Sequence, residues 1–257
     1  MPLYAPARLA SRSTLGYPSH AGFVNVHQDN SDGAKMKIAA DIPTAERVAN
    51  CALLVIDMQN DFVRQGAPLE VAEARDTIAP IRRLIDGFRA LGRPVVYTRF
   101  LAEQSDALIW LWSPQCQPEV KCCWEGIRRS YADAAGDLEC IAVIDELAPL
   151  PVEAIVDKYG YGSFHKTNLD ARLKALGVAS VVVTGTVAQI CVEETGREAF
   201  HHGYRTTMVS DGVSSFDPEL KAAALKNFAM KFGWVADSQT VLAWLQEAEV
   251  GSLRRTG

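Results

Sequence analysis

From residue 51 onward, apolar segments of strand length alternate with segments whose apolar residues recur at helical spacing. The apolar runs predict strands at 51–58, 94–100, 154–158, 180–185 and 206–210. The helical spacings predict helices at 78–91, 168–177, 191–203, 218–231 and 238–249. Such alternation is typical of repeated strand–helix–strand units around a parallel sheet. We therefore predict an α/β fold, an open doubly wound parallel sheet with helices on both faces, in three Rossmann-like layers.

Two segments lack this regularity. Residues 1–48 carry prolines and glycines that would break a helix, so we expect an irregular N-terminal arm before a single domain at 49–250. Within that domain, residues 101–150 bring tryptophans, prolines and cysteines close together, which indicates an irregular insertion with short helices. The length of 257 residues and the hydrophobic fraction of 48% are sufficient for one large core.

Charge and cysteine content argue against several classes of function. The net charge of −5 offers no general attraction to nucleic acids or anionic membranes, and no apolar run approaches the ~18 residues of a membrane span. The six cysteines lack the density of a disulfide scaffold, which favours a reducing cytoplasm. Because no glycine-rich phosphate loop follows a predicted strand, we expect no nucleotide or other cofactor.

Three chemically capable side chains follow predicted strands or begin a helix. Asp57 and Lys158 end two strands, and Cys191 stands at the start of a predicted helix. Sites of open parallel sheets form at the carboxyl ends of the strands. A helix N-terminus and a nearby ammonium would both lower the pKa of the Cys191 thiol, and Asp57 would serve as base. Each residue alone has a structural alternative: a buried small hydrophobe, a loop cap or an edge charge.

The sequence around these residues carries a specific resemblance. The motifs are LLVIDMQNDF at 53–62, DKYGYGSF at 157–164 and VTGTVAQICVEETGREAFHHGYRTTMVSDGVSSF at 183–216. Together they resemble the isochorismatase-like cysteine hydrolases, over about residues 50–245. The resemblance implies that Asp57 is the catalytic base, Lys158 the activating cation and Cys191 the nucleophile.

The same resemblance implies a specific backbone at the nucleophile. It places a non-proline cis peptide bond between Thr186 and Val187, with the backbone N–H groups of Val187 and Cys191 forming an oxyanion hole. The implied reaction is attack of the Cys191 sulfur on an amide or ureido carbonyl, departure of the nitrogen and hydrolysis of the thioester by water.

Departures from the family narrow the activity. The nicotinamidases of the family bind a metal through an Asp and histidines after the second strand, but this chain has no His at 95–106, so we predict no catalytic metal. The vinyl-ether hydrolases of the family generally lack the cysteine, so Cys191 favours cleavage of a C–N bond. Many relatives have Asn or Asp where this chain has Gln189.

Substrate recognition is expected from residues beside the three catalytic candidates. The candidates are Gln59, Asn60, Phe62, Arg99, Tyr159 and Gln189. Arg99 would bind a substrate carboxylate through two hydrogen bonds, although a surface ion pair is an equally good interpretation.

The motif spacing and the FGWV run at 232–235 resemble the ureidoacrylate and biuret-type members most. We therefore predict an amidohydrolase for a small ureido or carbamoyl compound of the biuret, triuret or ureidoacrylate type. An amidase for a maleamate-like or N-carbamoyl amino acid and a non-catalytic homologue are the alternatives. Since the family commonly forms dimers or tetramers, we expect a homo-oligomer.

Overall fold

A computed structural model describes residues 42–102, 108–113 and 116–256. The predicted N-terminal arm lies outside this part up to residue 41, and its last residues include the short helix α1 (Thr44–Arg47). None of the helices within these ranges is long and apolar enough to cross a membrane.

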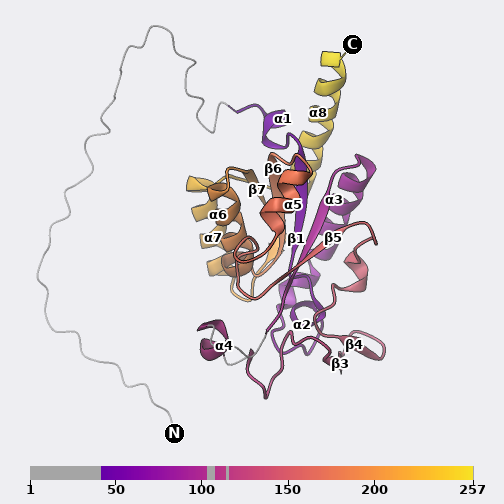
Figure 1. Cartoon of the computed structure of the whole chain (residues 1–257), viewed down its shortest axis with the longest axis vertical. Helices are drawn as coiled ribbons and strands as arrows, with labels where there is room; N and C mark the ends of the chain where they lie inside the picture. Colours follow the sequence, from indigo (N-terminus) through magenta and orange to yellow (C-terminus); the bar gives the residue numbers. More distant parts are fainter. Residues whose placement is uncertain (1–41, 103–107, 114–115, 257) are drawn as a thin grey trace, which may run out of the picture. The chain divides into compact units, whose positions relative to one another are not determined.

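A six-stranded sheet forms the centre of the domain (Figure 1). Its strand order is β5-β2-β1-β6-β7-β8, and every neighbouring pair is parallel. The strands are β1 (Cys51–Ile56), β2 (Val95–Phe100), β5 (Ala154–Lys158), β6 (Ser180–Thr186), β7 (Arg205–Ser214) and β8 (Trp234–Ala236). The predicted parallel sheet is confirmed, but β8 was not predicted because three residues are too short to show a pattern.

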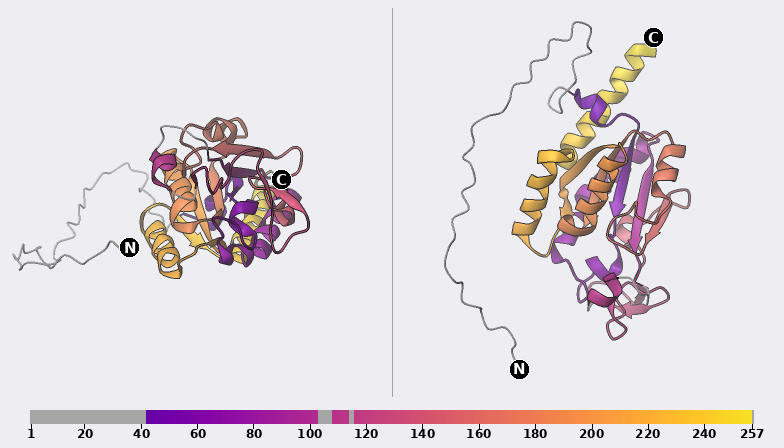
Figure 2. Two further views of the ribbon diagram at one scale, coloured as in Figure 1. Left: turned by 90° about the horizontal axis from the view of Figure 1, so that it is seen from below. Right: turned by 60° about the vertical axis from the view of Figure 1, so that its left-hand side comes forward.

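Helices cover both faces of the sheet (Figure 2). The first face carries α3 (Ile78–Ala90) and α8 (Ser238–Thr256), and the second carries α5 (Leu169–Ala175), α6 (Glu193–His201) and α7 (Pro218–Lys231). Alternate residues of β1 enter the two hydrophobic clusters, with Leu53 in the first and Leu54 in the second. Because a central parallel strand is buried on both faces, β1 is apolar at every position.

The residues that precede α7 and α5 differ in whether their side chains cap the helix. Asp217 caps α7, since its carboxylate accepts hydrogen bonds from the N–H groups of Glu219 and Leu220. Asn168 precedes α5, but its side chain makes no capping hydrogen bond and instead accepts a hydrogen bond from Arg172 Nε.

The segment predicted as an insertion contains only short elements. They are α4 (Leu108–Trp112), the antiparallel pair β3 (Arg128–Ser130) and β4 (Asp137–Glu139), and the 3-10 helix η4 (Asp145–Leu147). In Figure 1, α4, β3 and β4 lie beyond the lower end of the sheet, and β3 and β4 lie near α2 (Asn60–Val63). Gln59 and Val143 form an isolated bridge, so the insertion packs against the loop that follows β1.

Candidate active site

The end of β1 is shaped by a close approach to β6. Gly185 of β6 has φ +112°, and a Cβ atom there would overlap the carbonyl oxygen of Ile56. Asp57 follows Ile56 with φ +52°, a left-handed conformation that redirects the chain directly after the strand. A glycine is therefore required at 185 for the residues around Asp57 and those preceding Cys191 to come together.

Asp57 and Lys158 form a fully buried ion pair. Lys158 Nζ lies 2.7 Å from Asp57 Oδ2, and both residues have 0% exposure. The hydroxyl of Thr98 donates to Asp57 Oδ1 over 2.8 Å, and Lys158 Nζ donates to the carbonyl oxygen of Gly160 over 3.1 Å. The two side chains come from β1 and β5, which are separated in the sheet by β2.

Cys191 completes the cluster. It lies in a π-helical turn, Ala188–Val192, that leads into α6, and its thiol is close enough to Asp57 and Lys158 for both to act on its pKa. The predicted start of a helix near this residue is confirmed. The structure thus brings together the three side chains that the sequence placed at separate strand and helix ends.

The pKa of the Cys191 thiol is raised to about 12. Burial is the main cause, because it disfavours the thiolate. Lys158 lowers this pKa and Asp57 raises it, so the ion pair does not offset burial. We expected Lys158 and the helix terminus to produce a thiolate at neutral pH, but burial outweighs Lys158 and raises the pKa of the thiol. At rest Cys191 is a thiol next to a carboxylate, an arrangement suited to proton transfer during attack.

Lys158 is a cation despite its burial. Burial lowers the pKa of its ammonium group, but interactions with Asp57 and Cys191 act in the other direction and raise the pKa overall. A buried ammonium beside a thiol stabilises negative charge as it develops on sulfur. The chemical capacity of this cluster is therefore a base, a nucleophile and a fixed positive charge.

The peptide bond between Thr186 and Val187 is cis, as the resemblance implied. It lies between β6 and the turn that carries Cys191. Val187 and Cys191 both line the same cavity. The role of their N–H groups as an oxyanion hole stays a prediction.

A cavity of about 430 Å³ opens at the Cys191 side chain. Its lining comes from the loop after β1, the end of β2, the insertion, and the segments after β5, β6 and β7. The lining residues are Phe62, Pro68, Leu69, Glu70, Val71, Phe100, Ser113, Cys116, Tyr161, Val187, Ile190, Cys191 and Phe216. A volume of this size is typical of sites for small molecules.

Among the recognition candidates from sequence, Phe62 lines this cavity. Gln59 does not, because its amide bonds the backbone of Phe100 twice, at 2.9 Å and 2.7 Å. Asn60 donates to the carbonyl oxygen of Glu139 and accepts from Arg64 Nε. Both polar side chains therefore hold the loop after β1 in place.

The other three candidates also lie away from the cavity lining. Arg99 makes two hydrogen bonds to Asp157, of 2.7 Å and 2.9 Å, which is the surface ion pair considered as the alternative. Tyr159 lines a smaller neighbouring cavity of about 80 Å³ beside Trp110. The amide atoms of Gln189 are buried and have no hydrogen-bond partner within the described part of the chain.

Sequence reasoning missed several residues of the site. Thr98, which bonds Asp57, is a polar residue within an apolar strand run, and that contrast was the available signal. Phe216 follows β7 and therefore lies at the carboxyl end of a strand, where a site was expected. Residues 68–71 come from an irregular loop, for which no periodicity exists.

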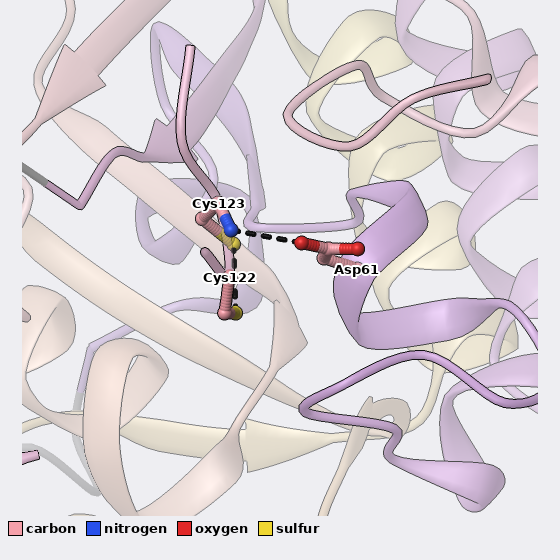
Figure 3. Close-up of side chains that lie close together, drawn as sticks. All are labelled: Asp61, Cys122 and Cys123. Atoms are coloured by element: carbon pink, nitrogen blue, oxygen red, sulfur yellow. Dashed lines mark hydrogen bonds between the residues drawn. The ribbon is translucent and has the colours of Figure 1, made fainter. Parts of the chain in front are cut away.

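Within the described residues, one group has the composition of a metal site (Figure 3). Asp61, Cys122 and Cys123 place their ligand atoms within 4.8 Å of one another, and all three are buried. The Asp61 carboxylate already accepts hydrogen bonds from Tyr131 and the Cys123 N–H, and Arg129 Nε lies 3.1 Å away. These partners satisfy Asp61 without an ion. No sequence motif indicated this group, because Asp61 is distant from the two cysteines along the chain.

Comparison with known proteins agrees with the motifs. The family model of the isochorismatase domain matches residues 51–240. A ureidoacrylate amidohydrolase RutB of Rhizobium rhizogenes is 30% identical over 217 residues, which cover 80% of this chain and 87% of the relative. Nicotinamidase 3 of Arabidopsis thaliana is 32% identical over 188 residues, covering 72% of this chain and 84% of that protein.

Solved structures show the same fold. A cysteine hydrolase from Pseudomonas syringae pv. phaseolicola superposes with a TM-score of 0.68 at 26% identity, covering 80% of this chain and 95% of that one. An N-carbamoylsarcosine amidase from Thermoplasma acidophilum has a TM-score of 0.58 at 32% identity, covering 73% and 96%. The chain therefore belongs to the isochorismatase family of hydrolases.

Proposed function

We propose that the protein is a cysteine-dependent amidohydrolase that cleaves a C–N bond of a small ureido or carbamoyl compound through a thioester intermediate. The observation that carries the proposal is the buried Asp57–Lys158 pair beside Cys191, which lines a cavity. The ureidoacrylate amidohydrolases and the N-carbamoylsarcosine amidase among the similar proteins support the ureido or carbamoyl class.

Acylation begins with a proton transfer. As the Cys191 sulfur attacks the carbonyl carbon, the thiol proton passes to Asp57, and the positive charge of Lys158 stabilises the sulfur while it loses that proton. Negative charge develops on the carbonyl oxygen. The N–H groups of Val187 and Cys191 donate hydrogen bonds to this oxygen and form the oxyanion hole. Asp57 then gives the proton to the leaving nitrogen, which departs as ammonia or an amine.

Deacylation repeats these steps with water. Asp57, again a carboxylate, takes a proton from a water molecule that attacks the thioester carbonyl. The tetrahedral intermediate collapses, the C–S bond breaks and the proton returns to the Cys191 sulfur. The released product is a carboxylic acid or a carbamate, which decomposes to an amine or ammonia and carbon dioxide.

The two alternatives receive no support from the geometry. The case for an acidic amide depended on Arg99, and this residue is paired with Asp157. The retention of Asp57, Lys158 and Cys191 in one cluster argues against a non-catalytic homologue, and a lack of ammonia release from every compound tested would favour it.

The test is ammonia release from a panel of biuret, triuret, ureidoacrylate, N-carbamoyl amino acids, maleamate and nicotinamide. The wild type is compared with Cys191→Ala and with Cys51→Ala, a matched control because Cys51 is a buried thiol in β1. We expect the wild type and Cys51→Ala to release ammonia from ureido or carbamoyl compounds. Cys191→Ala is expected to release none. Release that persists in Cys191→Ala would contradict the mechanism, and release from maleamate alone would contradict the substrate class.

A further inference from the structure

The described lining of the cavity beside Cys191 lacks the positive charge that would attract an acidic substrate. Within the described residues, Glu70 is the one charged side chain of the lining. Hydrogen bonds from the Gly66 N–H and from Arg75 lower the pKa of Glu70, so it is an anion at neutral pH. The described lining therefore carries negative charge and no cation.

The cationic side chains of Lys158, Arg75 and Arg99 are already paired with other groups of the protein. Lys158 is fully buried against Asp57, and Arg75 bonds both Glu70 and the carbonyl oxygen of Val63. Arg99 is paired with Asp157. The two internal segments outside the description, 103–107 and 114–115, contain neither Lys nor Arg in their sequence. A substrate carboxylate in this cavity would lose its hydration without gaining a cationic partner among the described lining residues, which is costly.

The walls of the cavity are aromatic and aliphatic. Phe62 and Phe100 have ring centroids 6.3 Å apart, and Phe100 stacks on Tyr161 at the same distance. Leu69 and Ile190 also line the cavity. Each methylene group of a substrate that such walls bury raises its affinity about fourfold.

We infer that the substrate is an uncharged ureido or carbamoyl compound that carries an apolar aliphatic or aromatic substituent. The inference rests on the amidohydrolase function proposed above, and it narrows that function by excluding carboxylate-bearing substrates. The reacting carbonyl lies at Cys191, and the substituent packs against the ring group formed by Phe62, Phe100 and Tyr161.

Matched pairs of compounds test the charge preference. Butylurea is compared with 3-ureidopropanoate, and pentylurea with 4-ureidobutanoate, by ammonia release from the full-length protein. The expected kcat/KM is at least about tenfold higher for the uncharged member of each pair, because its carboxylate counterpart must be desolvated without a partner. Butylurea is also expected to exceed biuret, which lacks an apolar substituent.

A pair of variants changes the charge of the cavity lining and tests the same preference in a second way. Leu69→Lys places a cation in the lining, and Leu69→Met places a neutral side chain of similar length there. We expect Leu69→Lys to shift the ratio of kcat/KM values towards 3-ureidopropanoate by about tenfold or more and Leu69→Met to keep the preference for butylurea. A circular dichroism melt of both variants verifies folding.

The outcomes separate this inference from the proposed function. Release that depends on Cys191 but favours the anionic members would overturn the inference alone. No Cys191-dependent release from any compound, biuret included, would overturn the proposed function. An unchanged ratio in a folded Leu69→Lys variant would contradict the assignment of this cavity as the place where the substituent binds.

Discussion

Asp57 and Lys158 are both fully buried, and their side chains face each other as an ion pair. Removing one partner of such a pair leaves an uncompensated buried charge, whereas removing both leaves two neutral groups. The pair is therefore central to stability as well as to the proposed chemistry, and substitutions can separate these two contributions.

Lys158→Met is expected to lower the free energy of unfolding by about 3–5 kcal/mol and to abolish ammonia release, because Asp57 is left unpaired. In Asp57→Asn/Lys158→Met we expect most of the stability to return while activity stays absent. Urea denaturation of the two variants measures the coupling. A double variant no more stable than Lys158→Met would show that the ion pair is not what the single substitution disrupts.

The raised pKa of Cys191 predicts its reactivity in the absence of substrate. Because the thiolate is the form that alkylates, the rate with iodoacetamide should keep increasing as the pH rises beyond about 9. Mass spectrometry of the Cys191 peptide distinguishes this thiol from the other five. A rate that levels off below about pH 8 would mean that the pKa is lowered, as the sequence first suggested.

At the scale of elements, the site depends on how closely β1 and β6 approach. Gly185→Ala places a methyl group against the Ile56 carbonyl in a backbone conformation that disfavours side chains. We therefore expect the free energy of unfolding to fall by more than about 4 kcal/mol, or no soluble protein to form. Gly92→Ala is the control, since its φ is +63° but its surroundings are open, and it should cost only about 1–2 kcal/mol. Thermal melts compare them, and equal losses would contradict the packing explanation.

The elements were predictable in proportion to their length and periodicity. The helix α7 occupies the predicted residues 218–231, because Pro218 and Asp217 give a strong start signal. The strand β8 and the hairpin of β3 and β4 are each three residues per strand and depend on contacts distant in sequence. Local patterns carry no information about such contacts.

The candidate site was predictable where chemistry coincides with a strand end. Asp57, Lys158 and Cys191 met this condition, and the motifs around them added their roles. Gln59 and Arg99 also stand near strand ends, but their side chains are hydrogen-bonded to the Phe100 backbone and to Asp157. Which polar side chain finds a partner inside the protein is decided by tertiary packing, and a single sequence does not reveal it.

At the scale of the whole molecule, buried thiols couple stability to pH. Burial raises the pKa of Cys51, Cys140 and Cys191 from 9.0 to about 12. Above pH 9 the unfolded chain loses these protons while the folded protein keeps them, so stability falls as the pH rises from about 9 towards 12. The slope is about 1.4 kcal/mol per pH unit for each thiol.

Urea midpoints at about pH 8 and pH 10 measure this dependence. We expect a lower midpoint at the higher pH and a smaller decrease in Cys51→Ala, which removes one of the buried thiols whose pKa is raised. A midpoint that does not change between the two values would contradict the predicted protonation of the buried thiols.

Assembly of the molecule stays a prediction. Leu111 and Trp112 of α4 are 62% and 87% exposed, and Met230 of α7 is 65% exposed. Exposed apolar side chains are suited to contacts with another copy of the chain, in line with the expected dimer or tetramer.

The intermediate of the proposed reaction can be observed directly. The protein is mixed with a compound that it hydrolyses, quenched in acid and analysed by mass spectrometry of the intact chain and of its peptides. We predict an acyl or carbamoyl adduct on the Cys191 peptide of the wild type and none in Cys191→Ala, which should also release no ammonia. Undiminished turnover in Cys191→Ala, or an adduct on a different cysteine, would contradict the assignment of Cys191 as the nucleophile.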